Sequence, residues 1–517
     1  MAQEIELKFL IESGSLPMLD SLPVIGKRLR NAPRKHIETT YFDTPKRHIA
    51  DSGYALRVRK QQGKGKLLSV KQANPTGVGR GEWESPIAGD MPSREELAAT
   101  PAGAVLGKNG NGSDLAPLYT VAVDRASFLV KQGSAEIEIA VDRGEIKHQD
   151  KELPICELEL ELKTGEPRQL FALARRFIDK APLRLSFISK GDRGNRLAEG
   201  SWGHPVGAST PKLTPEMTAA DAFRTICHSC LYDFMLNEPA IADDSDIEGV
   251  HRARIAIRRL RAALSLFKPL IADDEYEHIR RELSWLSGLL GAARDLDVMQ
   301  RETFEPPAEA GAAPMGTNAL LTVVARRRGV ARDALNKALL GERMRKLLLD
   351  LAHWLDHGAW RTAKETDIDH PVLQQARKLL TRQFKKLRKL SRRLAKAGPE
   401  ERHGIRIAAK KLRYMSEFFD SLVTGRKRRR RFKKYTRALE AIQGALGEIH
   451  DGEARGEFLE TLVAEVAGSD SANRAAVTAF AAGVFTARER PKEKKLIRKA
   501  RKAFAKLKDN RRFLKAA

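Results

Sequence analysis

Charged side chains alternate with apolar ones in several short segments of the first 200 residues. Residues 4–8 read Glu-Ile-Glu-Leu-Lys, and residues 157–163 read Glu-Leu-Glu-Leu-Glu-Leu-Lys. Because successive side chains point to opposite faces of a strand, each segment presents its charges on one face. Arg57 groups with Arg59 in the same way, and a carboxylate pair stands at positions 136 and 138. Some strands therefore offer carboxylates and others offer cations, which an ordinary mixed surface does not predict.

This segregation of charge favours one kind of chemistry. A single charged strand face is usually just solvated, so the inference rests on the whole set. Clustered carboxylates need cations among them, and hard oxygen ligands suit Mg²⁺ or Mn²⁺. Clustered Arg and Lys need an anion for the same reason. Since a complex of metal and polyphosphate satisfies both sets, the pattern predicts phosphoryl chemistry.

The elements that carry these charges fall into two classes along the chain. Period-two alternation predicts strands over residues 4–11, 39–44, 54–60, 67–72, 119–130, 135–142 and 155–163, with a helix at 168–180. Residues 201–215 are rich in Gly, Pro and Ser and are predicted to form a linker. From residue 216 the period becomes 3.6, which predicts helices only, among them separate helices over 427–450 and 453–467. The sequence therefore predicts an α+β multidomain protein, with a strand-rich domain at 1–200 and an all-α domain at 216–517.

Composition narrows the class of protein and its partners. The chain has 517 residues, of which 42% are hydrophobic, and a formal net charge of +26. Residues 1–200 hold 31 Lys and Arg against 27 Asp and Glu, whereas the remainder holds 62 against 40. Such a field predicts a polyanionic partner for the helical part. The sequence lacks the run of about 18 apolar residues that a membrane span needs, its start does not resemble a signal peptide, and it has three cysteines. We therefore expect a cytoplasmic protein that does not engage a membrane.

The strand-rich part resembles the CYTH, or triphosphate tunnel metalloenzyme, superfamily. The resemblance rests on the opening ExExK motif, ALRVRK at 55–60, SVKQ at 69–72, EIEIAVDRGEI at 136–146, CELELELK at 156–163 and SKGDRG at 189–194. It implies an eight-stranded antiparallel β-barrel, a tunnel with its charged faces inward and helices covering its apolar outer faces. It also implies metal ligands at Glu4, Glu6, Asp142 and two of Glu157, Glu159 and Glu161, and phosphate-binding cations at Lys8, Arg57, Arg59, Lys71, Arg125 and Lys190. Arg80 and Arg193 are weaker candidates for phosphate binding. Four further glutamates either have a structural role or contact the metal ligands, and the sequence favours neither role: Glu82, Glu84, Glu136 and Glu138.

The implied reaction is metal-dependent hydrolysis of inorganic tripolyphosphate to diphosphate and phosphate. The metal, Mg²⁺ or Mn²⁺, would neutralise phosphate oxygens while cationic side chains hold the phosphorus in line for attack by water. Adenylate cyclase or thiamine or nucleoside triphosphatase activity on the same tunnel is the enzymatic alternative. Those activities need a pocket for an organic group, and no aromatic-rich segment accompanies the tunnel strands.

The helical part contains an internal repeat. HRARIAIRRLR at 251–261 recurs as HGIRIAAKKLR at 403–413, and LSGLLGAARDLD at 286–297 is echoed by IQGALGEIHDGE at 442–453. At 100° per residue, the charged positions of the first block fall within about 80° of one another on a helical wheel, and the second block repeats this phase. The two basic stripes consist of His251, Arg254, Arg258 and Arg261, and of His403, Arg406, Lys410 and Arg413.

These repeated blocks resemble the CHAD domain. The resemblance covers residues 216–517 and implies two repeated helical bundles, at about 216–365 and 366–517, with a basic channel that binds long-chain polyphosphate. Phosphate contacts of this kind are electrostatic and sensitive to salt. Specific binding of nucleic acid is not expected, because the sequence lacks aromatic residues interleaved with basic ones on strands. A protein that binds polyphosphate without catalysis is the second alternative, and association with polyphosphate granules is a further expectation.

Overall fold

The computed structural model describes residues 5–19, 22, 25–61, 65–72, 81–108, 115–242, 246–304, 314–362, 367–469, 472–488, 492–511 and 513. Residue contacts divide the chain into two compact units. Unit 1 comprises Met1–Val206, Met235–Ala242 and Ala338–Gly358, and unit 2 comprises Gly207–Phe234, Asp243–Lys337 and Ala359–Ala517. The domain limits predicted at 200 and 216 stay a prediction. In packing terms, two short segments from beyond residue 216 belong to the strand-rich unit.

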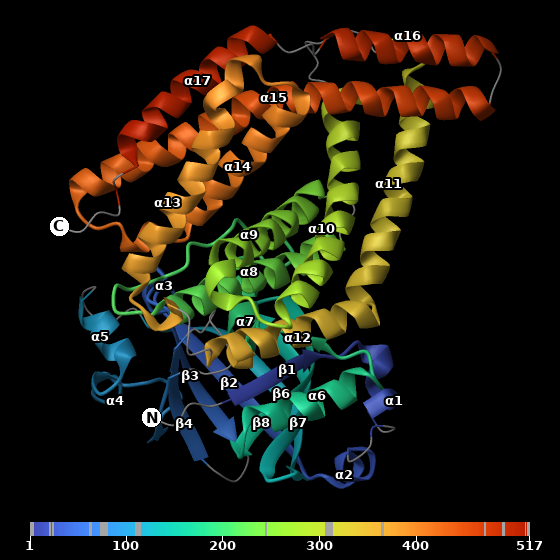
Figure 1. The fold of residues 1–517 in the computed structure, drawn as a ribbon. Coiled ribbons are helices and arrows are strands. Elements are labelled where there is room, and N and C mark those ends of the chain that lie inside the picture. Colours follow the sequence, from blue (N-terminus) through green and yellow to red (C-terminus); the bar gives the residue numbers. More distant parts are fainter. Residues whose placement is uncertain are drawn as a thin grey trace. The chain divides into compact units, whose positions relative to one another are not determined.

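Unit 1 is built on one antiparallel sheet (Figure 1). Its strand order is β5-β4-β3-β2-β6-β7-β8-β1-β9, which confirms the predicted antiparallel sheet. Eight strands have at least six residues each, and a two-residue ninth strand pairs with the end of β1. The strands are β1 (Ile5–Leu10), β2 (Arg34–Asp43), β3 (Tyr54–Gln61), β4 (Gly65–Gln72), β5 (Glu82–Ile87), β6 (Ala116–Gln132), β7 (Ala135–His148), β8 (Lys151–Thr164) and β9 (Arg184–Leu185).

Helices flank this sheet because its strands turn one apolar face away from the charged one. Leu7 and Phe9 of β1 are buried, and the amphipathic helix α6 contacts β1, β6, β7 and β8. Helix α12, which lies far along the chain, packs on α6: the ring of Phe171 lies 5.0 Å from that of His353 and 5.5 Å from that of His357. The helices of unit 1 are α1 (Leu16–Leu19), α2 (Gly26–Asn31), α3 (His48–Asp51), α4 (Arg94–Ala98), α5 (Pro101–Lys108), α6 (Pro167–Ile178), α7 (Lys190–Ala198) and α12 (Glu342–His357).

Unit 2 is helical throughout its described elements, as the 3.6-residue period predicts. Its helices are α9 (Ile247–Ile271), α10 (Tyr276–Val298), α13 (Val372–Leu390), α14 (Pro399–Glu417), α15 (Arg426–Ser469), α16 (Ala472–Arg488) and α17 (Glu493–Asn510), with most of α8 (Ala219–Ile241) and α11 (Thr317–Leu340). The first repeated block lies on α9 and α14, and the second lies on α10 and α15. The two copies contact each other, because Arg258 Nη2 donates to Tyr414 Oη at 2.5 Å and Lys411 Nζ donates to Ser265 Oγ at 2.8 Å. In the described part of the chain, no helix is both long and apolar enough to cross a membrane.

Helix α7 docks on the sheet through a close approach that depends on glycine. A Cβ placed on Gly194 would lie 2.1 Å from the ring of Tyr119. Tyr119 stacks on Tyr41 with ring centroids 4.6 Å apart and donates to the Gly191 carbonyl at 2.8 Å. The ring therefore has little room to move away.

We expect Gly194→Ala to displace α7 and to lower the free energy of unfolding by about 1–3 kcal/mol, the usual penalty for overpacking. The measurement is the midpoint of urea unfolding followed by circular dichroism. Gly107→Ala is the control, because a Cβ at Gly107 in helix α5 meets nothing within 4 Å. An unfolding midpoint for Gly194→Ala that equals that of the control would contradict the close approach.

Candidate functional site

Strand pairing brings the predicted charged side chains together on one face of the sheet. The paired positions are Glu6 with Glu161, Lys8 with Glu159, Asp142 with Glu157, and Arg125 with Asp142. This face borders a cavity of about 820 Å³. Its charged lining consists of Glu6, Lys8, Arg57, Arg59, Lys71, Glu82, Glu84, Arg125, Glu138, Asp142, Glu159, Glu161, Lys163, Lys190 and Asp192. Of the remaining predicted residues, Glu157 is buried against Lys190 and Arg193, and Glu4 and Arg80 lie outside the described residues.

Three carboxylates form the acidic centre of this cavity. Asp142, Glu157 and Glu159 each offer an oxygen, and these oxygens lie within 4.8 Å of one another. The ammonium of Lys190 lies among them, 2.8 Å from Asp142 Oδ2, 2.5 Å from Glu157 Oε2 and 2.7 Å from Glu159 Oε1. Arg125 donates to Asp142 Oδ1 at 2.7 Å and to Glu159 Oε2 at 2.5 Å. With the Arg193–Glu157 ion pair, three cations balance three carboxylates.

This mutual compensation shifts the titration of the cluster. Burial alone would lower the pKa of Lys190, but Glu157, Glu159 and Asp142 outweigh it and raise that pKa. Burial alone would raise the pKa of Glu159, but Lys190 and Arg125 hold it well below its usual value. Lys190 and Glu159 therefore stay charged at neutral pH, although both are largely buried.

A second cluster, on β3, β4 and β5, has an excess of cations. Arg57 donates to Ser69 Oγ and to Glu82 Oε1, both at 3.2 Å, and Lys71 Nζ lies 2.8 Å from Glu82 Oε2. Burial opposes ionisation of Glu82, but Lys71 and Arg57 outweigh it and lower its pKa to about 2. Burial and the neighbouring Glu82 raise the pKa of Glu84. Of these two carboxylates, Glu82 is thus ion-paired with Arg57 and Lys71.

The cations of this second cluster, Arg57, Arg59 and Lys71, form a cationic wall of the cavity. The charge of Arg59 is the least compensated by carboxylates. The charge of Arg57 and burial lower the pKa of Arg59, and its buried Nε has no hydrogen-bond partner among the described residues. Burial would raise the pKa of Tyr41, but Arg57, Arg59 and Lys71 outweigh it and lower that pKa. A cationic wall with an unsatisfied donor is suited to bind an anion.

Two further carboxylates of the cavity, Glu138 and Glu161, are paired with Lys163. Lys163 Nζ is 2.6 Å from Glu161 Oε1 and 3.0 Å from Glu138 Oε2. Burial lowers the pKa of Lys8, against the opposing charges of Glu157 and Glu6. Glu161 therefore belongs to a different ion-pair group from Glu159, although both lie on one face of β8.

The cavity suits a divalent cation by its donor chemistry. The three clustered carboxylates offer oxygen only, which is the donor that Mg²⁺ and Mn²⁺ prefer, and Lys190 already holds a positive charge among them. The acidic cluster therefore fits a cation at this position. The residues that would hold the ion are Asp142, Glu157 and Glu159, with Glu6 and Glu161 farther along the same cavity.

Three aromatic residues also line the cavity: Tyr41, Tyr54 and Phe187. The sequence did not predict them, because they do not lie together in one aromatic-rich segment. Tyr54 packs edge-on against Trp83, with ring centroids 6.3 Å apart. Arg193, which the sequence ranked as a weak candidate, is buried and paired with Glu157. The signal for Tyr41 is its parity with Thr39 on β2, which places both on the cavity side.

The repeated stripes of unit 2 converge from α9 and α14. Burial, followed by the charges of Arg258, Arg406, Arg254 and Arg413, lowers the pKa of Lys410 to about 7. Burial and Arg294 lower the pKa of His251 to about 4, and the ring of His403 lies 4.3 Å from that of His450. Arg254 lies 3.4 Å from Asp295, Arg261 donates to Ser287 Oγ at 2.9 Å, and Arg413 lies 3.0 Å from Glu417.

Both copies of the repeat leave donors or acceptors unsatisfied. In the described part of the chain, five buried atoms of the two basic stripes and of Arg294 have no hydrogen-bond partner: His251 Nδ1, Arg258 Nε, Arg294 Nη1, His403 Nδ1 and Arg406 Nε. Buried polar atoms are normally paired. Five of them around one group of cations indicate a site for a polar ligand.

Known proteins resemble both parts of the chain. Residues 2–193 match the CYTH domain, and residues 225–460 match the CHAD domain. The chain is 29% identical over 215 residues to an inorganic triphosphatase of Haemophilus influenzae, across 38% of this chain and 55% of that protein, so the match spans about half the length of this relative. It is 25% identical over 513 residues to an uncharacterised protein of Mycobacterium tuberculosis, across 90% of each. The crystal structure of the CHAD domain from the plant Ricinus communis is similar with a TM-score of 0.50 and 27% identity, across 58% of this chain and 96% of that chain.

The acidic centre makes folding sensitive to Lys190. Lys190→Met leaves three carboxylates with one cation fewer, and breaking a buried ion pair costs about 3–5 kcal/mol. The free energy of unfolding should fall by this amount at pH 7.5. Because the carboxylates of the variant have raised pKa values, they take up protons at acidic pH, and the loss should be smaller at pH 5.

The control is Lys180→Met, which removes an exposed lysine just after α6 and should change stability little at either pH. Urea unfolding at both pH values measures the difference. Equal stability of Lys190→Met and the control at pH 7.5 would mean that the ammonium does not compensate the cluster.

Proposed function

We propose that this chain, which carries a CYTH domain at residues 2–193 followed by a CHAD domain at residues 225–460, hydrolyses inorganic triphosphate with a divalent metal ion and binds polyphosphate through its helical part. The observation that carries the first half is the cavity of unit 1, where the carboxylates of β7 and β8 and the cations of β3 and β4 line one space. The name of the Haemophilus relative, an inorganic triphosphatase, supports the same substrate class.

The cationic wall binds the phosphates in this proposal. Arg57 and Lys71 are fixed by Glu82, so their remaining donors are oriented before the substrate arrives. Arg59 brings a buried donor without a partner in the described structure. Such preorganised cations stabilise the charge that develops on the leaving phosphate oxygens.

The acidic centre holds the metal. Asp142, Glu157 and Glu159 would bind Mg²⁺ or Mn²⁺, which would neutralise phosphate oxygens and polarise the bond that breaks. Lys190, released from these carboxylates, has its ammonium within the same cavity and is available to phosphate. A further carboxylate of the lining orients water and accepts its proton.

Attack by water is favoured over a covalent enzyme intermediate. Ser189 is the serine that lines the cavity, and its Oγ donates to Asp192 Oδ2 at 2.7 Å while it caps helix α7. No cysteine or histidine belongs to the described lining. The products are therefore diphosphate and phosphate, with the new P–O bond formed from water.

Phosphate release tests this half of the proposal. Tripolyphosphate, ATP and thiamine triphosphate are compared with Mg²⁺ and with Mn²⁺, and we expect tripolyphosphate to have the highest kcat/KM. Glu159→Gln keeps the shape of the side chain but removes a metal-binding charge, so kcat/KM should fall by about 100-fold or more. Glu152→Gln, an exposed change on the same strand, is the matched control. Near-normal activity of folded Glu159→Gln at saturating metal would refute the assignment, and a preference for ATP or thiamine triphosphate would favour the organic alternatives.

The second half of the proposal assigns polyphosphate to the repeats of unit 2. It is supported by the five unsatisfied buried atoms of the two stripes and Arg294 and by the convergence of Arg254, Arg258, Arg406 and Arg413 on Lys410. Cations held this close repel one another, and a chain of phosphates relieves that repulsion. Such binding displaces counterions and weakens as salt rises.

Lys410 gives this binding a pH dependence. Its pKa is about 7 in the free protein, and bound phosphate raises it, so binding takes up a proton above pH 7. Affinity for long polyphosphate should therefore fall between pH 7 and 9, by at most ten-fold per pH unit from this group. Lys410→Arg keeps the charge at every pH and should bind with a flatter profile, measured with EDTA present to prevent hydrolysis. Identical pH profiles of the two proteins would exclude Lys410 from the site.

A further inference from the structure

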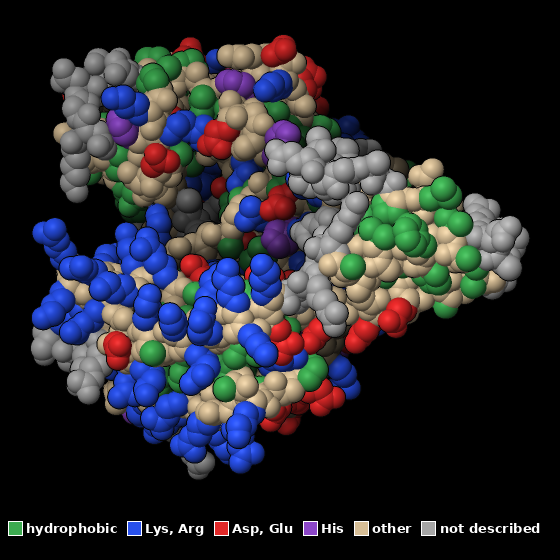
Figure 2. Space-filling model, turned by 90° about the horizontal axis from the view of Figure 1, so that it is seen from above, with side chains coloured by type: hydrophobic (Ala, Val, Ile, Leu, Met, Phe, Trp, Pro, Cys, Tyr) green, Lys and Arg blue, Asp and Glu red, His purple; other side chains and the backbone are tan. Residues whose placement is uncertain are grey.

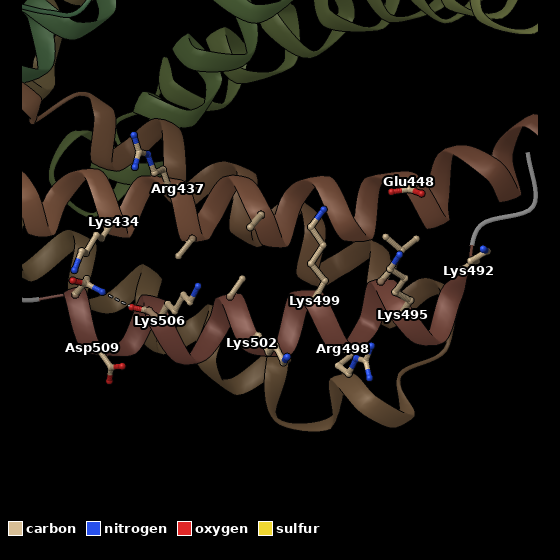
Figure 3. A pocket seen from close by; sticks show the side chains of 15 residues that line it. Lys434, Arg437, Glu448, Lys492, Lys495, Arg498, Lys499, Lys502, Lys506 and Asp509 are labelled. Carbon is tan, nitrogen blue, oxygen red and sulfur yellow. Dashed lines mark hydrogen bonds between the residues drawn. The ribbon is translucent and has the colours of Figure 1, made fainter. Parts of the chain in front are cut away.

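Unit 2 carries a second basic groove, between α15 and α17 (Figure 3). Its volume is about 1120 Å³. Its polar lining consists of Lys434, Arg437, Glu448, Lys492, Lys495, Arg498, Lys499, Lys502, Lys506, Asp509 and Asn510. Figure 3 shows Lys434 and Lys506 toward one end of the groove and Lys492 and Lys495 toward the other. The described lining of the groove thus has eight cations and two carboxylates along its length.

The cations of this groove have no internal compensation. No ion pair joins any of the eight to an acidic side chain in the described part of the chain, and all eight residues are exposed. Lys495, Lys499, Lys502 and Lys506 follow a spacing of four, three and four residues, which places them on one side of α17 over about 16 Å. Figure 2 shows Lys and Arg side chains crowded over the C-terminal helices of unit 2, with few acidic ones among them.

This groove is separate from the repeat stripes. On α15, Lys434, Arg437 and Glu448 share one side of the helix, whereas His450, whose ring contacts that of the stripe residue His403, lies about 200° further round from Glu448. Helix α17 begins at Glu493, beyond the CHAD match that ends at residue 460. The groove is therefore an addition to the site assigned to the repeats.

The lining favours an extended phosphate chain over other polyanions. Among the described residues, no aromatic side chain lines the groove, so these residues offer no stacking surface for the bases of a single-stranded nucleic acid. Its apolar residues are Ala438, Ala441, Leu496 and Ala503, and all but Ala441 are buried. Little apolar surface remains for an amphipathic acidic peptide. What the groove presents is a row of cations.

We propose that the groove between α15 and α17 is a second binding site for linear polyphosphate. The ligand lies along α17 and contacts the ammonium groups of its lysines, while Lys434 and Arg437 contact it from α15. The choice of polyphosphate rests on the proposed function of unit 2, but the position of the groove does not. Each site is therefore tested by its own variant.

The test compares two triple variants of the full-length protein that remove the same charge from the same helix. The groove variant is Lys499→Gln, Lys502→Gln and Lys506→Gln. The control variant is Lys494→Gln, Arg501→Gln and Lys508→Gln, at exposed positions of α17 outside the groove. Neither changes the buried stripe of Leu496, Ala500, Ala503 and Leu507, and thermal unfolding verifies that both remain folded.

Binding to immobilised long-chain polyphosphate is measured in EDTA over a range of salt. Three lost contacts should lower the slope of log K against log salt by about 2 and weaken binding by about ten-fold at physiological salt in the groove variant alone. Replacing the same three lysines by arginine should preserve binding. Equal affinities of the groove and control variants would overturn the proposal, as would single-stranded DNA that competes equally at matched phosphate concentration.

A third variant separates this proposal from the repeat site. Arg254→Gln with Arg258→Gln should weaken binding on its own. If that variant binds normally while the groove variant does not, the repeat site fails and the groove stands. The reverse result refutes the groove alone. Polyphosphate should also protect Lys499, Lys502 and Lys506 from acetylation more than Lys494 and Lys508, and equal protection would count against the groove.

Discussion

Unit 1 depends on one interaction: the positive charge of Lys190 compensates the negative charges of Asp142, Glu157 and Glu159. Buried carboxylates are tolerated only because cations lie within hydrogen-bond distance. The register of β6, β7 and β8 aligns the carboxylates with Arg125, and helix α7 adds Lys190 from its first turn. The position of α7 depends in turn on the contact between Gly194 and Tyr119. Lys190, a phosphate-binding cation under the proposed function, and the stability of the sheet therefore depend on one set of contacts.

Unit 1 pairs opposite charges, whereas unit 2 places cations near other cations. Around Lys410 the neighbours are cations, and burial together with their repulsion lowers its pKa to about 7. The groove along α17 has its cations on an exposed face, where water and dissolved salt screen them from one another. The repulsion around Lys410 lowers the stability of the fold, and a bound anion would restore it. The exposed cations along α17 lower stability little. Two basic surfaces on one unit can thus differ in how strongly ligand binding stabilises the fold.

The sequence predicted the charged face of each strand because a period of two fixes the side of every residue. It left open which two of Glu157, Glu159 and Glu161 act together, since all three share that face. Their side-chain contacts divide them: Glu157 and Glu159 lie with Asp142 of β7, whereas Glu161 is ion-paired with Lys163 of its own strand. Tertiary packing accounts for other differences. Helix α15 runs through Gly452, where two helices were predicted, and the packing of α12 on α6 has no local signal.

The two units differ in their balance of positive and negative side chains, and this difference affects which step each unit performs under the proposed function. The cavity of unit 1 contains carboxylates beside its cations, so a bare polyphosphate entering it meets repulsion as well as attraction. A metal ion among Asp142, Glu157 and Glu159 would remove that repulsion and free Lys190 for phosphate, so metal and substrate would favour each other's binding. The repeats and the groove of unit 2 present cations in excess and need no metal for attraction. Under the proposed function, capture of polyphosphate by unit 2 is therefore independent of the metal, whereas hydrolysis in unit 1 is coupled to it.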